Sequence, residues 1–211
     1  MARLSKRQRK NIEKPFKLSV LDHQEIRENS YDWSSTNLKP LKDRIRKHYK
    51  KEQNGLCSYC KLPFRDVIQV EHMVPKGDLY GRSEFSFLPT NLSVACTSCN
   101  TKKSINNDMI PWDRTDYPKA GLFFKIIHPH YDPYLMHIEI VDKSRYTPKT
   151  VKGYNTIKRC KLYESNITEQ LVKYMKYEDD PLIQGVLRIR ELQGDLSNIK
   201  NKIDRFFSLL F

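Results

Sequence analysis

Four cysteines in two C-x-x-C pairs constrain this chain more than any other feature. The pairs are Cys57-Ser-Tyr-Cys60 and Cys96-Thr-Ser-Cys99, and residues 61–95 separate them. Four thiolates match the number and softness of the ligands in a closed tetrahedral zinc site. The 35 residues between the pairs exceed the usual spacing of a compact finger or ribbon. We therefore expect a structural zinc ion that joins the two ends of an intervening structural unit.

Other interpretations of the cysteines stay open at this point. Unrelated thiols or a redox pair also produce C-x-x-C spacing, although thioredoxin-like use needs a neighbouring βαβ pattern, which the sequence lacks. The fifth cysteine, Cys160, stands alone. We expect it to be a small packed hydrophobic residue.

The charge balance favours a polyanionic partner. The chain has 211 residues, with 38 Lys and Arg against 25 Asp and Glu, a formal net charge of +13. Such an excess neutralises phosphates and releases counterions, so nucleic acid is the leading class of partner. Ribosomal, membrane-surface and merely soluble basic proteins share this charge, so charge alone does not decide the function.

No segment of the sequence indicates a membrane or secreted protein. None approaches the roughly 18 uninterrupted apolar residues of a membrane span. The N-terminus, MARLSKRQRKNIEKPFKL, lacks the apolar run and cleavage site of a signal peptide. We expect no membrane contact and a cytoplasmic location, where cysteines are more often metal ligands than disulfide partners.

A basic amphipathic helix is predicted just before the first cysteine pair. Leu41, Ile45 and Tyr49 recur at four-residue steps among charged residues, and Asn54-Gly55 follows as a C-terminal stop. Residues 1–17 form a basic segment without glycine, which is either a disordered arm along phosphates or a solvated tail.

Two short strands and a helix are predicted around the second cysteine pair. Residues 67–74 form a short run rich in β-branched residues, as a buried strand does, and residues 91–95 are expected to form a second short strand. The run after Cys96 lacks glycine and proline and is expected to open a helix. The resulting order is strand, loop, strand, helix.

The C-terminal half contains two further patterns. Residues 121–142 hold two apolar segments around a proline-rich turn, which predicts a hairpin or two strands. Farther on, apolar residues at three- and four-residue steps predict a long amphipathic helix, with Ile183, Val186, Ile189, Leu192, Leu196, Ile199, Ile203, Phe206 and Leu210 on one face. That face packs either on the chain's own helices or against another subunit.

These patterns predict an α+β fold in four parts. They are a basic N-terminal segment (1–37), a central domain with the four cysteines (38–115), a β-rich extension (116–150) and an α-helical C-terminal region (151–211).

Several residues between and after the cysteine pairs follow a specific order: Glu71-His72, Pro75-Lys76, Asn91, Asn100 and Lys103. With the segments CSYC (57–60), VEHMVP (70–75), NLSVAC (91–96) and CTSCNTKK (96–103), the sequence resembles the HNH endonucleases. These belong to the ββα-metal, or His-Me finger, superfamily, and the resemblance is to their four-cysteine form. The resemblance covers about residues 40–110, and it depends on these motif residues occurring in the same order along the chain as in the family. It implies a zinc-braced ββα-metal core that hydrolyses phosphodiester bonds, most simply those of DNA.

The resemblance also implies a role for each polar residue. His72 matches the general base, and a neutral imidazole can take a proton from water at cellular pH. Glu71 and Asn100 match the ligands of a catalytic divalent ion, Mg²⁺ or Mn²⁺, where the family more often has Asp and His; both departures keep an oxygen ligand. Asn91 matches the asparagine whose amide bonds to the backbone and fixes the loop that aims the histidine.

Two lysines complete the expected site. Lys76 and Lys103 match positions that contact phosphates, and at each a solvated surface lysine is the plainer alternative. The zinc ion is expected to hold the first strand and the helix in register, so that His72 and Asn100 converge.

A histidine-rich segment, HPHYDPYLMH, follows the motif and contains His128, His130, Asp132 and His137. A second metal cluster, a contribution to the cleft and simple ring packing in a proline-rich turn are all possible, and ring packing is preferred. A similar turn occurs in HNH nuclease subunits of Septu-type antiphage systems. This loose resemblance implies an antiphage effector with an ATPase or other partner subunit on the C-terminal helix, although the chain contains no ATP-binding loop.

Two rivals to a nuclease stay open. One is a non-catalytic zinc-ribbon module that binds nucleic acid through the basic segment and helix. The other is an assembly subunit with a vestigial motif. The sequence does not distinguish DNA from RNA, or single strands from duplexes.

Overall fold

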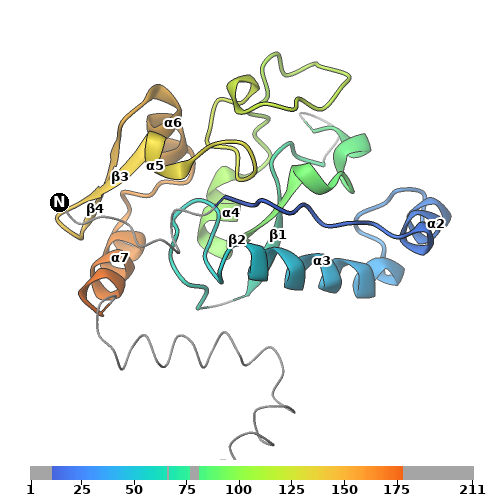
Figure 1. The fold of residues 1–211 in the computed structure, drawn as a ribbon, viewed down its shortest axis with the longest axis horizontal. Coiled ribbons are helices and arrows are strands. Elements are labelled where there is room, and N and C mark those ends of the chain that lie inside the picture. The colour runs from blue at the N-terminus through green and yellow to red at the C-terminus, as the bar shows by residue number, and fades with distance from the viewer. Residues whose placement is uncertain (1–10, 66, 77–80, 178–211) are drawn as a thin grey trace, which may run out of the picture.

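The computed structural model describes residues 11–65, 67–76 and 81–177, and Figure 1 shows their arrangement. The helices are α2 (Val20–Glu28), α3 (Lys39–Glu52), α4 (Thr97–Lys103), α5 (Tyr134–His137), α6 (Val151–Arg159) and α7 (Ser165–Tyr177). The strands are β1 (Ile68–His72), β2 (Leu92–Cys96), β3 (Ile138–Val141) and β4 (Arg145–Pro148). Helices mixed with two small antiparallel sheets confirm the predicted α+β class. Among the described residues, no helix has the length and apolar character needed to cross a membrane.

The first sheet and the helix after it form a ββα unit. β1 and β2 pair antiparallel, with Ile68 opposite Cys96 and His72 opposite Leu92. α4 follows β2 directly, and Cys96 is its N-cap residue. This is the strand, loop, strand, helix order predicted from the sequence.

Helix α3 covers one face of this sheet (Figure 1). Its core-facing residues Leu41, Ile45 and Tyr49 are fully buried, as their four-residue spacing predicts. Asn54 and Gly55 then adopt positive φ angles of 54° and 70°, which ends the helix. The helix, its core face and its stop signal are therefore confirmed.

Two apolar cores lie on opposite sides of the β1–β2 sheet. The α3-side core contains Ile12, Ile26, Leu38, Leu41, Ile45, Tyr49, Phe87, Leu92 and Val94. The zinc-side core contains Cys57, Cys60 and Cys99 and extends through the residues of α5, α6, α7 and the β3–β4 sheet. The ββα unit is thus packed on both sides, although it is small.

The N-terminal segment differs from the prediction over its described part. Ile12 is buried in the α3-side core, and its backbone N–H donates to the carbonyl of Pro129 at 3.1 Å. The backbone N–H of Phe16 donates to the Tyr49 hydroxyl at 3.1 Å. Residues 11–17 are therefore neither a disordered arm nor a solvated tail, because their apolar side chains pack into the core; residues 1–10 lie outside the described part.

The second hairpin lies later than predicted. β3 and β4 pair between Ile138 and Pro148, whereas residues 121–142 were expected to hold the strands. Phe124, Ile126 and Ile127 are buried as expected of a strand, but their backbone makes only a single bridge, between Met109 and Phe124. Burial in this segment comes from side-chain packing and not from a strand ladder. α6 and α7 fall in the predicted helical region, and Ile183–Leu210 lies outside the described residues.

Candidate active site

Four cysteine sulfurs meet where the ends of the ββα unit come together. Cys57 and Cys60 lie in the turn after α3, whereas Cys96 ends β2 and Cys99 lies in the first turn of α4. Their sulfur atoms all lie within 4.8 Å of one another. Tetrahedral Zn–S bonds of about 2.3 Å place sulfurs about 3.8 Å apart, so the number, type and spacing of the donors fit a structural zinc ion.

Backbone contacts attach the first cysteine turn to β2. The backbone N–H and the hydroxyl of Ser58 both donate to the carbonyl of Val94, at 3.1 Å and 3.0 Å. The backbone N–H of Cys96 donates to the Cys57 sulfur at 3.4 Å. Burial alone raises the pKa of the Cys57 thiol, but hydrogen bonds with the other three cysteines outweigh it and hold that pKa well below its usual value. Hydrogen bonds with neighbouring cysteines raise the pKa of the Cys60 and Cys99 thiols, so Cys57 is the member of the cluster in which thiolate, the form that binds zinc, is favoured.

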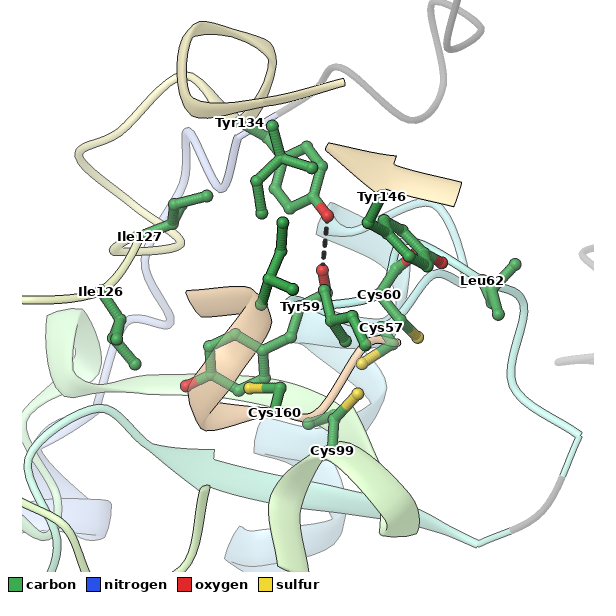
Figure 2. Close-up of a cluster of buried hydrophobic side chains, with 14 of the residues drawn as sticks. Cys57, Tyr59, Cys60, Leu62, Cys99, Ile126, Ile127, Tyr134, Tyr146 and Cys160 are labelled. Atoms are coloured by element: carbon green, nitrogen blue, oxygen red, sulfur yellow. Dashed lines mark hydrogen bonds between the residues drawn. The ribbon is translucent and has the colours of Figure 1, made fainter. Parts of the chain in front are cut away.

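Two buried tyrosines brace the same turn from the zinc-side core (Figure 2). The Tyr134 hydroxyl donates to the carbonyl of Tyr59 at 2.8 Å, and the Tyr146 hydroxyl donates to the carbonyl of Cys60 at 2.7 Å. Cys160 lies fully buried in this core beside Cys99, as its expected packing role requires. No sequence pattern predicted that these two tyrosines hold the turn, because they lie far from it along the chain.

Asn91 clamps the loop that follows β1. Its side-chain carbonyl accepts from the backbone N–H of Val74 at 2.7 Å, and its amide donates to the carbonyls of Val74 and Phe85, each at 3.0 Å. The residue is 1% exposed. It therefore joins the segment just after His72 to the segment that contacts the His72 ring.

His72 ends β1 and lies on the side of the sheet that faces α3. Its Nε2 lies 3.0 Å from the main-chain carbonyl of Ser86. Because a carbonyl oxygen can only accept, Nε2 must carry the proton, and Nδ1 is left as the acceptor. Burial, with help from the charge of Lys76, lowers the pKa of His72 to about 3. The imidazole is therefore neutral at physiological pH.

Glu71 lies on the opposite side of β1 and is 4% exposed. Its Oε1 accepts from the Tyr59 hydroxyl at 2.9 Å and lies 2.8 Å from the Lys103 ammonium. Burial raises the pKa of Glu71, and Lys103 opposes that rise. The carboxylate therefore has a charged partner within the fold.

The surroundings of Lys103 differ from those expected of a lysine that binds phosphate. Its side chain is 1% exposed, and besides Glu71 its ammonium binds the carbonyl of His72 at 2.9 Å. An ammonium that is buried between a carboxylate and a carbonyl does not face a substrate. The predicted phosphate contact at Lys103 is corrected to an internal ion pair that ties the end of α4 to the end of β1.

Asn100 lies over the same face of β1 as Glu71. Its amide nitrogen donates to the Gln69 side chain at 2.7 Å, and Gln69 shares a face with Glu71 because strand side chains alternate. Carboxylate and amide oxygens are of the type that a hard divalent ion prefers. The ion would share Glu71 with the Lys103 ammonium.

The expected convergence of His72 and Asn100 is not seen. The His72 ring contacts Ser86 and the Trp33 ring on the α3 side, whereas Asn100 contacts Gln69 on the α4 side. The reason is the pleat of β1, which sends adjacent side chains to opposite faces. The structure brings Glu71 and Asn100 to one face and places His72 on the other, at the end of the strand.

Lys76 is exposed, and its ammonium lies 5.8 Å from the centre of the Trp33 ring. Partial burial and the nearby charge of Lys42 lower the pKa of Lys76. The sequence did not single out Trp33, because it precedes the motif by more than 20 residues and no periodic pattern marks it. Of the two lysines expected to bind phosphate, Lys76 is the one that faces solvent.

The histidine-rich segment packs as rings. His128 is fully buried and stacks on Tyr131 at a centroid distance of 4.1 Å, and the Tyr117 hydroxyl lies 2.8 Å from its Nε2. His130 Nε2 lies 2.7 Å from the carbonyl of Leu92, and His137 Nδ1 lies 2.8 Å from the Thr150 hydroxyl. In the described part of the chain, the zinc cysteines form the one cluster of His, Cys, Asp or Glu suited to a metal. Ring packing, the preferred interpretation, agrees with this arrangement.

These features define a class of domain, a ββα unit with a four-cysteine cluster and with a glutamate and a histidine at the end of its first strand. Residues 57–105 match the model of the HNH endonuclease family. The match begins at the first zinc cysteine and ends just beyond α4, so this segment is an HNH endonuclease domain with a four-cysteine cluster. No curated protein and no solved structure matches the chain.

Proposed function

We propose that the chain is a metal-dependent endonuclease that hydrolyses phosphodiester bonds, most simply in DNA, with His72 as general base. An HNH endonuclease domain implies a nucleic-acid substrate. The assignment of His72 as the general base rests on the hydrogen bond between its Nε2 and the Ser86 carbonyl. It leaves Nδ1 of a neutral imidazole as the atom that takes the proton from the attacking water.

Glu71 and Asn100 are the residues that would hold Mg²⁺ or Mn²⁺. When bound, such an ion offsets negative charge on the phosphate and on the leaving oxygen. Glu71 contributes a carboxylate and Asn100 an amide oxygen, both on the α4 face of β1. The Lys103 ammonium opposes the rise that burial causes in the pKa of that carboxylate, and ties it to the backbone of His72.

The end of β1 is the place where a scissile phosphate would meet both faces. Glu71 and His72 are adjacent there, and β1 pairs only with β2 among the described strands. A phosphate lying across this end contacts the oxygen ligands on one side and the imidazole on the other. Lys76, exposed four residues beyond His72, supplies a cation for the backbone.

The exposed face of α3 extends this surface for binding nucleic acid. Its outward residues include Lys39, Lys47, Lys50 and Lys51, all exposed. A helix that carries several cations beside the site suits the phosphates on either side of the cleaved bond. Binding should therefore weaken as salt rises.

A cleavage panel tests the proposal. Plasmid, single-stranded DNA and RNA are incubated with Mg²⁺, Mn²⁺ or EDTA, comparing wild type with His72→Ala. We expect metal-dependent cleavage that His72→Ala lowers by about 10²–10⁴-fold, with zinc content and unfolding temperature retained. His48→Ala is the matched control, because His48 lies on the same side of the sheet but contacts the carbonyl of Lys14 and the rings of Phe16 and Tyr49, and not His72. Equal cleavage by wild type and His72→Ala contradicts the assignment.

A second candidate is a non-catalytic zinc module that binds nucleic acid. The ion pair between Lys103 and Glu71 favours it, because an ammonium already neutralises the carboxylate expected to bind the metal. This candidate predicts salt-sensitive binding of nucleic acid without metal-dependent cleavage. The cleavage panel therefore separates the nuclease from the non-catalytic module. An antiphage role, and a partner subunit bound to the amphipathic helix that the sequence predicts within residues 183–210, extend the nuclease proposal; these residues lie outside the described part of the chain. Size-exclusion chromatography of the chain alone and with the product of its genomic neighbour tests them.

A further inference from the structure

One aromatic residue outside the HNH segment contacts the proposed base directly. The Trp33 ring lies 4.5 Å from the His72 ring between centroids, with the two planes at 88°. This edge-to-face arrangement is a preferred geometry for ring pairs. The hydrogen bond to Ser86 holds one nitrogen of His72 but leaves the ring free to swing about that bond. A perpendicular ring beside it removes that freedom.

Trp33 is itself held in place by the elements around it. Its ring packs on Phe87 at 5.0 Å between centroids, in the α3-side core. The Lys42 ammonium, on α3, donates to the carbonyls of Trp33 and Ser35, at 3.1 Å and 2.8 Å. Because both the ring and the backbone of Trp33 are held in place, its indole can restrict the orientation of a ring that packs against it.

The same indole also contacts the exposed cation of the site. The Lys76 ammonium lies over the Trp33 ring at 5.8 Å, a cation–π contact. Trp33 therefore touches both the group proposed to take the proton and the group proposed to hold the phosphate. Both contacts need Trp33, which lies outside residues 57–105.

We propose that Trp33 is a positioning residue, whose indole fixes the ring plane of His72 and the ammonium of Lys76 at one site. The inference rests on the proposed function of His72 as the base. It means that the HNH segment is completed by the loop before α3, which supplies a wall of the site from outside the family match.

The test compares Trp33→Ala with Trp33→Phe, which keeps a ring. We expect Trp33→Ala to lower kcat by about 10–100-fold with KM changed less than threefold, because a misplaced catalytic group lowers the rate of chemistry. Trp33→Phe should stay within about threefold of wild type, because a benzene ring can still contact the imidazole edge to face. Phe16→Ala is the matched control, since Phe16 packs on the same core but contacts His48 and not His72.

A second measurement does not depend on cleavage. Nitrogen-15 NMR of the His72 ring at fixed pH should show one tautomer, protonated on Nε2, in wild type and Trp33→Phe, and exchange broadening in Trp33→Ala. Ring signals of Trp33→Ala that match wild type overturn the inference. So does an equal loss of kcat in Trp33→Ala and Phe16→Ala at matched unfolding temperatures. A wild-type protein that cuts nothing overturns the proposed nuclease function instead, and the NMR result then decides the role of Trp33 by itself.

Discussion

The two faces of β1 differ in chemistry although their residues alternate along one short strand. On the α3 side, Ile68 and Val70 pack on the α3-side core and His72 lies among aromatic rings. On the α4 side, Gln69 and Glu71 make hydrogen bonds and an ion pair with α4. The comparison shows how neighbouring residues meet opposite surroundings: His72 is a neutral imidazole among aromatic rings, whereas Glu71 is a buried carboxylate paired with an ammonium.

The two sides are also stabilised by different means. The zinc-side core depends on four sulfurs and a buried ion pair, whereas the α3-side core depends on the packing of a helix. Loss of metal, loss of charge and change of pH should therefore affect the two sides unequally.

Loss of zinc should have the largest effect. Cys99→Ser removes one of four ligands, and structural zinc binding contributes about 10–16 kcal/mol in small zinc domains. We expect zinc content to fall and amide exchange to speed up in β3 and α4 before it does in α3. Metal analysis and hydrogen exchange measure this. Cys160→Ala, which alters a buried thiol beside Cys99 but outside the ligand set, should keep its zinc. Uniform loss of protection on both sides contradicts the comparison.

The buried ion pair should come next. Lys103→Met leaves the Glu71 carboxylate buried without its cation, which costs about 3–5 kcal/mol in the free energy of unfolding. The double variant with Glu71→Gln should cost less than the sum of the two single changes. Urea unfolding measures all three.

The neighbouring lysine is the control for this ion pair. Lys102 pairs with Glu164, both about one third exposed, so Lys102→Met should cost less than about 1 kcal/mol. If Glu71 also binds the divalent ion, Mg²⁺ should stabilise Lys103→Met more than wild type, because the ion replaces the ammonium. Equal costs for Lys102→Met and Lys103→Met contradict the internal role of Lys103.

A pH effect on the α3 side should be the smallest. Burial, and then the charge of His48, lower the pKa of His130 from 6.5 to about 4. His130 therefore binds a proton more readily in the unfolded state than in the folded state. The contribution of neutral His130 to the free energy of unfolding is complete above pH 6.5 and is lost as pH falls toward 4. Between pH 7 and 5 the loss is about 2 kcal/mol.

His130→Gln removes this titration but keeps a donor for the Leu92 carbonyl. Urea unfolding at several pH values should therefore give a shallower pH dependence for this variant than for wild type. Parallel curves for the two proteins contradict the buried neutral state of His130.

Short-range patterns carried much of the prediction. Two-residue spacers bring cysteine pairs together, four-residue steps bury one helix face, and Asn54-Gly55 ends that helix, because each depends on local backbone geometry. The order of motif residues also located the HNH segment. Contacts between distant segments were not predicted, including the two tyrosines on the first cysteine turn and the ring of Trp33 on His72.

By itself, the sequence determined the four-cysteine cluster, the ββα order and the position of the HNH segment, since spacing and order along the chain specify them. Tertiary structure decided which partner each polar side chain meets. The pleat of β1 separated His72 from Glu71, and packing of α4 buried Lys103 against that carboxylate. A pattern of residue types records which side chains are present, but their burial and charge partners arise only when distant segments pack together.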